Sequence, residues 1–410
     1  MDFDDTAEEA AFRAEVKSFL ATNAEPKKRG APPSRSRNVG PEELARAKKF
    51  QAAKAAAGLV GLTWAKAWGG REAAPIFQVI YNQEEEAYAI PRGVFEIGLG
   101  MCIPTMMAYA TPDQLKRFVG PALRGEEVWC QLFSEPSGGS DVAAVRTRAE
   151  KNGDTWTING QKIWTSGAQF SDFGIMVTRS DPTVPKHMGL TFFFLDMKSP
   201  GIEIRPIKQA SGASHFNEVF FTDVKIPDSQ RLGAVGQGWR VSLTTLMNER
   251  LAIGDTPRPD VEDLLDLCRQ IDLDGEPAMQ NVAAREKIAD MHVRSQGLKY
   301  TRFRTMTALS RGQTPGPESS IGKLVNAAKL QDIASYGMDL LGSAGMVMNK
   351  DLAPMNAMFQ EALLGAPASR IAGGTDEILR NIIAERVLGL PGDIRVDKEI
   401  PFNRLPTGKR

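Results

Sequence analysis

The sequence changes character twice along its length, and this change most constrains the fold. From residue 5 to about residue 125, apolar residues recur at mixed spacings of three and four, which is typical of amphipathic helices. Between residues 128 and 224, β-branched and aromatic runs alternate with turn-forming pairs such as Asn159-Gly160, which indicates strands and hairpins. The helical spacing returns after Gly238. The predicted helices include 12–22, 42–59, 239–253, 282–311, 320–341, 351–364 and 375–388, and the predicted strands include 155–158, 174–178 and 191–195.

This order predicts an α+β multidomain chain. We expect an N-terminal α-helical domain at 1–125, a central antiparallel β domain at 126–235, a C-terminal helical domain at 236–395 and a tail at 396–410. A chain of 410 residues is long enough for two or three such domains, each with its own core.

Composition removes several classes of function. Lys plus Arg and Asp plus Glu both number 50, so no basic excess is present to neutralise nucleic-acid phosphates. The 3 cysteines and 3 histidines are scattered without zinc-like spacing, so we expect no metal site and a reducing compartment. An acidic N-terminus and the lack of a long apolar run predict a cytoplasmic protein without membrane insertion.

Two stretches of the β region could carry chemistry. Residues 130–141 read as a strand that enters a loop of small residues, Ser134-Glu135-Pro136-Ser137-Gly138-Gly139-Ser140-Asp141. Such a loop can bring backbone N–H groups and hydroxyls close to a ligand, or it can be a sharp turn between strands. The second stretch, 160–168, ends a strand with Trp164, Thr165 and Ser166, where the indole can belong to the core or can stack on a flat heteroaromatic ring.

Together these stretches resemble the acyl-CoA dehydrogenase family, whose β domain carries Ser/Thr-Glu-Pro-x-x-Gly-Ser-Asp followed by Gly-x-Lys-x-Trp-x-Thr/Ser. Further stretches in the family's order extend the resemblance over nearly the whole chain. They are Phe216-Asn217-Glu218-Val219-Phe220-Phe221, Gly238-Trp239, Asn248-Glu249-Arg250, Ile371-Ala372-Gly373-Gly374-Thr375 and 382–391.

The resemblance implies FAD as cofactor, held between the β domain and a C-terminal four-helix bundle and shared across a subunit interface. It implies that Ser166 hydrogen-bonds flavin N5 and that Ser140 also contacts the acyl-CoA. It also implies that the turn at Thr375 and Glu377 approaches the adenosine half of FAD. The full set of implied cofactor residues is Gln131, Phe133, Ser134, Gly139, Ser140, Trp164, Thr165, Ser166, Arg269, Gly342, Ser343, Thr375 and Glu377.

Dehydrogenation of an acyl-CoA needs a carboxylate that removes the α proton. Many family members carry it directly before Gly-Thr in the final turn, but Gly373 stands there in this chain. A bacterial group of the family carries it instead on the first bundle helix, where this chain has Glu249. Leu243, Leu246, Met247, Leu251 and Ile253 form one apolar arc of that helix. Arg250 lies inside the arc and Glu249 on its edge. Glu249 is therefore the predicted base and Arg250 a supporting, substrate-binding residue.

Two departures from the family pattern concern the subunit interface. The family's Arg-x-x-Phe-Gly, which binds the FAD diphosphate, is replaced by 272–277, so Arg269 is the candidate substitute. Only part of a Gly-Gly-x-Gly motif remains at Gly342 and Ser343.

The sequence therefore predicts an acyl-CoA dehydrogenase that forms a trans-2-enoyl-CoA in fatty acid or sterol side-chain β-oxidation. We expect it to pass electrons to an electron-transfer flavoprotein. We expect a tetramer or dimer, built from one chain or together with a paralogue. Two alternatives remain open: an oxygen-reactive acyl-CoA oxidase or flavin monooxygenase of the same fold, and a non-catalytic subunit of a heteromeric dehydrogenase.

Overall fold

The structure is a computed structural model, and it describes residues 5–27, 39–252, 259–310, 316–317 and 319–405. The chain forms two compact units by its internal contacts. Unit 1 comprises Met1–Ser34, Ala74–Ala89 and Gly254–Gly392, and unit 2 comprises Arg35–Ala73, Ile90–Ile253 and Asp393–Arg410.

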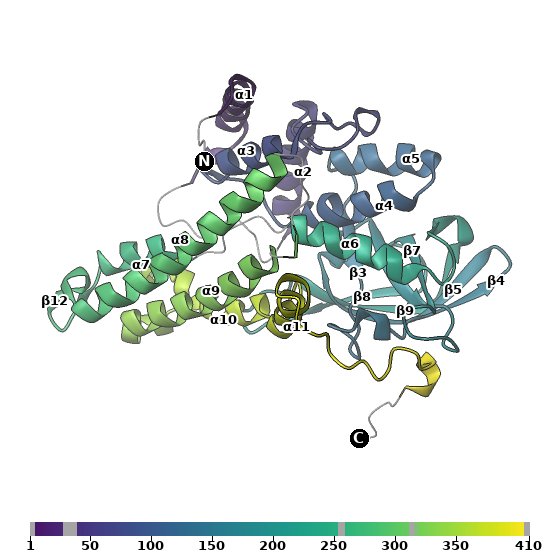
Figure 1. The fold of residues 1–410 in the computed structure, drawn as a ribbon. Helices are drawn as coiled ribbons and strands as arrows, with labels where there is room; N and C mark the ends of the chain where they lie inside the picture. Colours follow the sequence, from purple (N-terminus) through teal and green to yellow (C-terminus); the bar gives the residue numbers. More distant parts are fainter. Residues whose placement is uncertain (1–4, 28–38, 253–258, 311–315, 318, 406–410) are drawn as a thin grey trace. The chain divides into compact units, whose positions relative to one another are not determined.

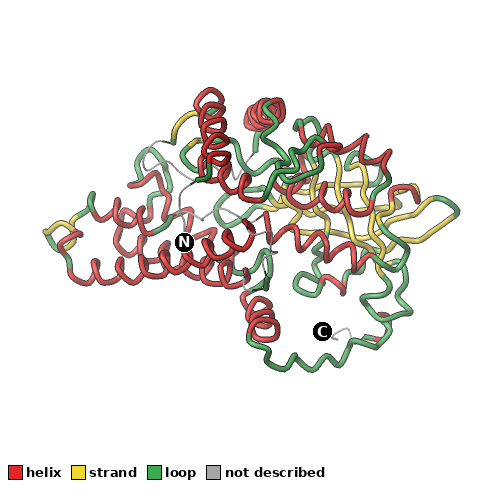
Figure 2. Tube along the Cα trace, turned by 45° about the horizontal axis from the view of Figure 1, so that its top comes forward, coloured by secondary structure: helices red, strands yellow, loops and turns green. Residues whose placement is uncertain are grey.

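Unit 1 is helical. Within it, α8, α9 and α10 contact one another in sequence and run side by side (Figures 1 and 2). Gly337 allows the close approach of α9 and α10, because a Cβ there would lie 2.1 Å from the Phe359 ring. Its helices are α1 (Ala7–Asn23), α3 (Pro75–Glu85), α7 (Val261–Cys268), α8 (Val282–Ser310), α9 (Ser319–Leu341), α10 (Met358–Ser369) and α11 (Asp376–Ile382), with two-residue ladders β1 (Glu25–Pro26)–β2 (Tyr88–Ala89) and β11 (Asp272–Leu273)–β12 (Glu276–Pro277).

Unit 2 contains the sheet. The strand order is β10-β7-β6-β4-β5-β9-β8, and β3 also pairs with β6. The β3–β6 and β4–β6 pairings are parallel, so the sheet is mixed, whereas the sequence predicted an antiparallel one. The strands are β3 (Trp129–Leu132), β4 (Arg148–Asn152), β5 (Thr155–Ser166), β6 (Phe173–Arg179), β7 (Leu190–Asp196), β8 (Ile202–Ile207), β9 (Phe216–Pro227) and β10 (Arg231–Leu232).

Helices of unit 2 cover one face of this sheet (Figure 1). Phe192 and Phe194 of β7 share a core with Leu115 and Val119 of one helix and Val241 of another, and all five side chains are buried. Burial of this apolar area fixes the helices on the sheet. The helices are α2 (Pro41–Ala56), η1 (Lys66–Trp68), the π-helical turn η2 (Gly98–Cys102), α4 (Ile103–Tyr109), α5 (Pro112–Leu123) and α6 (Gly238–Ala252).

The predicted succession of helices, strands and helices is confirmed, but besides the mixed sheet one helix boundary differs from the prediction. The helix predicted over 351–364 begins only at Met358, because Met355, Asn356 and Ala357 have φ values of 53°, 53° and 59°. Three left-handed residues interrupt a right-handed helix. Thr375 caps α11 as expected, since its side chain accepts a hydrogen bond from the Ile378 N–H.

Candidate functional site

A buried ion pair joins the small-residue loop of unit 2 to strand β5. Lys162 is fully buried, and its Nζ donates to Glu135 Oε1 at 2.8 Å and to the Phe133 carbonyl at 3.0 Å. Glu135 also accepts from the backbone N–H groups of Arg146 at 2.6 Å and Thr147 at 2.9 Å. Each of these hydrogen bonds connects the start of the loop, at Phe133 and Glu135, either to its end at Arg146 and Thr147 or to Lys162 of β5.

These bonds favour the ionised form of Glu135. Burial raises the pKa of Glu135, but the charge and hydrogen bond of Lys162 and the two backbone donors outweigh burial and hold that pKa below its ordinary value. A buried carboxylate with this many donors fixes the loop geometry, because any movement would leave a charge without partners.

Within the loop, the turn Glu135–Gly138 is closed by two backbone hydrogen bonds of 2.9 and 3.0 Å. Gly139 and Ser140 then stand exposed, and a Cβ at Gly139 would meet no atom within 4 Å. The sequence left open whether this stretch is a ligand-binding loop or a sharp turn. The structure shows a turn, and its outer edge at Gly139 and Ser140 is exposed.

Trp164 is presented to solvent by an irregularity in strand β5. The pairing of β5 with β9 shifts register between Lys162 and Thr165, and Trp164 has a φ of 59°. A bulge of this kind redirects a side chain out of the regular alternation. The indole is 54% exposed, and one edge contacts the Phe216 ring at a centroid distance of 5.9 Å. Trp164 is therefore not a core residue of this unit, and its left-handed backbone is strained for an aromatic residue.

The neighbours of Trp164 alternate between the two faces of β5. Ser166 is half-buried, whereas Thr165 is buried and its hydroxyl has no hydrogen-bond partner among the described residues. Thr165 pairs in register with Asn217, whose side-chain N–H₂ donates to the Thr165 carbonyl at 2.9 Å. In the part of the chain that the structure describes, Asn217 Oδ1 also has no partner.

Other predicted residues lie in strand β3 or directly after it, at the start of the loop. Gln131 and Ser134 are half-buried, and the Ser134 carbonyl accepts from the Ile163 N–H at 2.9 Å. Phe133 is buried, with its ring edge-on to Phe192 at 5.6 Å. The Phe133 ring thus belongs to the core, and its carbonyl serves the Lys162 ion pair.

Helix α6 carries the two residues predicted for proton transfer, Glu249 and Arg250, whose side chains lie outside the described part of the structure. The buried face of α6 holds Ser242 and Thr245, and Thr245 Oγ1 lies 2.9 Å from Thr105 Oγ1 of α4. Position 249 follows these residues by seven and four, which places it on the same helical face.

The apolar arc predicted on α6 coincides only in part with the face that packs within the unit. Leu246 packs against the core of unit 2, whereas Leu243 is 42% exposed and Met247 is 61% exposed. The side chain of Leu251 and the whole of Ile253 lie outside the described part.

The remaining predicted cofactor residues belong to unit 1. Arg269 caps α7 and forms an exposed ion pair with Asp266 at 2.8 Å. Gly342 begins the short helix η7 (Gly342–Met346) with a φ of 51°, and Ser343 beside it is exposed. Glu377 is exposed in the first turn of α11, beside the Thr375 cap.

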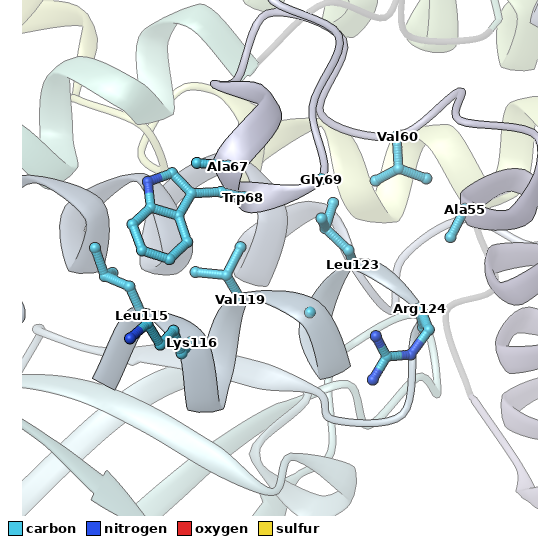
Figure 3. A pocket seen from close by; sticks show the side chains of 11 residues that line it. Ala55, Val60, Ala67, Trp68, Gly69, Leu115, Lys116, Val119, Leu123 and Arg124 are labelled. Atoms are coloured by element: carbon cyan, nitrogen blue, oxygen red, sulfur yellow. The ribbon is translucent and has the colours of Figure 1, made fainter. Parts of the chain in front are cut away.

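A cavity of about 440 Å³ lies elsewhere in unit 2, between α5 and the segment 55–69 (Figure 3). Apolar side chains such as Val60, Trp68 and Val119 line it, and none of the motif residues does. Its two cations already have partners, because Lys116 lies 3.6 Å from Asp113 and Arg124 lies 2.6 Å from Glu126. Its lining shows no set of groups that could carry chemistry.

The sequence interpretation did not include Lys162 and Glu135 among the functional residues. A signal was present: one glutamate and one lysine stand 27 residues apart, each within a motif made mainly of small and apolar residues. Charged residues at positions expected to be buried indicate a pair.

Comparisons with known proteins cover all three regions. The N-terminal domain of acyl-CoA dehydrogenases matches residues 6–126, the middle domain 130–224 and the C-terminal domain 236–388. The chain belongs to the acyl-CoA dehydrogenase family. It is an oxidoreductase of that family, and a flavin cofactor follows from the membership.

Two relatives come from Mycobacterium tuberculosis. Acyl-CoA dehydrogenase FadE34 is 38% identical over 389 residues, which cover 94% of this chain and 50% of FadE34. The chain thus spans about half the length of that relative. Acyl-CoA dehydrogenase IpdE1 is 35% identical over 396 residues, which cover 94% of this chain and 98% of IpdE1.

Solved structures show the same fold. The Tcur3481-Tcur3483 steroid ACAD superposes with a TM-score of 0.80 at 24% identity, covering 96% of this chain and 100% of that one. The ChsE4-ChsE5 complex from Mycobacterium tuberculosis gives a TM-score of 0.79 at 23% identity, covering 96% and 100%. Among the described residues of this dehydrogenase, no helix has both the length and the apolar character to cross a membrane.

Proposed function

We propose that this protein catalyses FAD-dependent α,β-dehydrogenation of an acyl-CoA thioester to a trans-2-enoyl-CoA, with Glu249 as the base. The observation that carries the proposal is the exposed indole of Trp164, which stands on a strained backbone in the same unit as the exposed residues Gly139 and Ser140. Family membership supports the reaction class.

The residues present fit a flavin. Trp164 offers a planar face that the chain itself leaves uncovered, and Ser166 places a half-buried hydroxyl two residues away. Trp164 and Ser166 would border the isoalloxazine ring, and Ser134 and Ser140 would supply polar contacts to the cofactor. When bound, FAD supplies the two-electron acceptor that takes the hydride from the substrate β carbon.

Unit 1 carries further candidate cofactor residues. We propose Thr375 and Glu377 for the adenosine portion of FAD, and Arg269, Gly342 and Ser343 for contacts made across a subunit interface. We also propose the three-domain division 1–125, 126–235 and 236–395 as the functional organisation.

Glu249 is proposed to remove the α proton. By helical spacing, position 249 follows Ser242 by two turns and Thr245 by one turn of α6. A carboxylate placed beside the substrate α carbon is suited to remove the α proton. The turn before α11 offers only Ile371, Ala372, Gly373 and Gly374, so it has no competing carboxylate. Arg250, the next residue of α6, is proposed to bind the polar part of the substrate.

Anaerobic mixing of the purified protein with a panel of acyl-CoA thioesters tests the proposal. The panel contains straight-chain and steroid side-chain thioesters, and the measured quantity is bleaching of the flavin absorbance. The Glu249→Gln variant should keep its flavin and bind acyl-CoA, yet bleach about 10²- to 10⁴-fold more slowly. Glu150→Gln is the matched control, because Glu150 is an exposed residue of β4. Bleaching of Glu249→Gln at the rate of the control would refute the assignment.

The electron acceptor and the assembly complete the proposal. We propose an electron-transfer flavoprotein as acceptor and an oligomer of identical or paralogous chains. Rapid reoxidation of the reduced protein in air with release of peroxide would favour the oxidase or monooxygenase alternative. Bleaching only after addition of a paralogous chain would favour a subunit of a heteromeric dehydrogenase.

A further inference from the structure

The C-terminal segment of unit 2 lies against the β domain. Residues 397–405, called the strap below, follow an extended stretch (Figure 1). Within the strap, the Phe402 N–H donates to the Val184 carbonyl at 2.9 Å, and the Asn403 N–H donates to the Pro182 carbonyl at 2.9 Å. Pro401 also forms a bridge with Pro185. Backbone bonds of this kind fix the strap in register on the β6–β7 connection.

One lysine connects the strap to the Ser140 loop. Lys186 Nζ donates to Asp397 Oδ2 of the strap at 2.5 Å and to Asp141 Oδ2 of the loop at 2.6 Å. The Lys186 side chain is only 10% exposed, so both carboxylates lie around a largely desolvated ammonium group. Charge-assisted bonds in such surroundings are stronger than surface ion pairs. Loss of Asp397 would leave Lys186 with one carboxylate and a changed position.

A second contact links the strap to the far side of the same loop. The guanidinium of Arg179 is buried and donates to the carbonyls of Ala143 at 2.5 Å, Val145 at 3.3 Å and Lys186 at 2.6 Å. The Phe402 ring covers this guanidinium, with Arg179 Cζ 3.9 Å from the ring centroid. The aromatic face stabilises the cation and excludes water from its hydrogen bonds.

The loop that carries Ser140 is therefore held at three places. Lys162 and Glu135 fix its base from inside the sheet, as described above. Arg179 fixes the carbonyls of Ala143 and Val145, and Lys186 fixes Asp141, directly beside Ser140. Only the last two of these attachments include the strap.

We propose that Asp397 and Phe402 are positioning residues that hold the Ser140 loop in the shape required to bind FAD and the acyl-CoA thioester. The inference rests on the proposed function, because it assigns ligand binding to that loop. It adds a residue set from the C-terminal tail, which belongs to neither motif of the β domain. The strap touches no reacting atom and acts through Lys186 and Arg179.

Two strap variants and two matched controls test the inference. Asp397→Asn removes the carboxylate that faces Lys186, and Phe402→Ala removes the ring that covers Arg179. Glu399→Gln and Ile394→Ala are the controls, because Glu399 is exposed and Ile394 is 92% exposed in the same tail. Asp397→Glu serves as a rescue variant, since it keeps the charge.

The first measurement is hydrogen exchange of the backbone amides of residues 137–145 in the purified full-length protein, which needs no activity. We expect about tenfold faster exchange in Asp397→Asn and Phe402→Ala, equivalent to roughly 1.4 kcal/mol, and no change in the controls. We expect no change in residues 155–163 of β5. Unchanged exchange of the loop in both strap variants would refute the inference.

The second measurement is the dissociation constant of FAD, together with KM and kcat for an acyl-CoA. Weaker FAD binding and a raised KM, with kcat changed less than KM and with Asp397→Glu partly restoring both, would support positioning. Unchanged FAD affinity and KM despite faster loop exchange would refute it. If the unaltered protein bound no flavin, the proposed function would fail, while the exchange measurement would still decide whether the strap orders the loop.

Discussion

Replacement of Lys162 by Met is the sharpest perturbation of the site. Met keeps most of the aliphatic volume of the lysine but removes the Nζ atom that bonds Glu135 Oε1 and the Phe133 carbonyl. The Glu135 side chain is only 4% exposed, so water cannot replace the lost donor. The variant therefore leaves a buried carboxylate that keeps only the N–H groups of Arg146 and Thr147.

The structure sets the size of the effect. Removal of one partner of a buried ion pair costs about 3–5 kcal/mol. Because Glu135 retains two backbone donors, we expect about 3 kcal/mol, the lower end of that range. The unpaired carboxyl should also titrate at a higher pH, because burial is then opposed by fewer favourable interactions. The double variant Lys162→Met with Glu135→Leu should recover part of the loss, since it removes the isolated charge.

Native-state hydrogen exchange of the β5 amides 155–166 is the suitable assay, because global unfolding of a multidomain chain is not two-state. Lys198→Met is the matched control. The Lys198 side chain is 74% exposed and pairs with Asp172 at the surface, so its loss should change little. Flavin content should fall in Lys162→Met and stay unchanged in the control. Equal exchange rates in Lys162→Met and Lys198→Met would show that the buried pair does not hold the loop.

Two further predictions concern the stacking residue and acid stability. Trp164→Ala should weaken flavin binding by roughly 1–3 kcal/mol, the range known for bases stacked on aromatic side chains, whereas Trp164→Phe should retain most of the affinity; titration of the apoprotein with FAD measures both. The side-chain hydrogen bonds of Arg231 and Trp156 hold the pKa of Asp228 well below its ordinary value. The ionised carboxylate therefore stabilises the fold above about pH 4, and this contribution is lost as the pH falls toward the lowered pKa. The unfolding temperature, measured from pH 7 to pH 2, should fall less steeply with decreasing pH in Asp228→Asn than in the unaltered protein. An equal fall of the unfolding temperature in both proteins would contradict this reasoning.

Features with short-range causes were predictable from the sequence. The Thr375 cap depends on a side chain and an N–H three residues apart, and it is present as expected. The β-branched run at 174–178 and the aromatic run at 191–195 lie in β6 and β7, because β-branched and aromatic side chains suit a buried, pleated surface. The loop motif and the Trp164 motif are likewise contiguous stretches of sequence, and the resemblance to the family rests on them. Assignment of Glu249 and of the individual cofactor residues remains a prediction.

The tertiary structure decided which side chains are buried and which of them meet. The apolar arc on α6 identified the packed face only in part. Leu246 packs against the core, but the polar Ser242 and Thr245 are also buried, with Thr245 against Thr105 of α4, and Leu243 is exposed. Local patterning cannot report this, since a hydroxyl is buried at low cost only when a distant residue supplies its partner.

The same reason applies to the ion pairs and to the exposed indole. Lys162 pairs with Glu135 and Lys186 pairs with Asp397, although the partners are far apart in the sequence. No local pattern indicates which charged residues will form these pairs. The bulge that turns Trp164 outward depends on the register between β5 and β9. The sequence by itself therefore determined the order of elements, the helix caps and the family, because these follow from neighbouring residues. Long-range pairing determined the shape of the site, because its energies depend on partners that only the folded chain brings together.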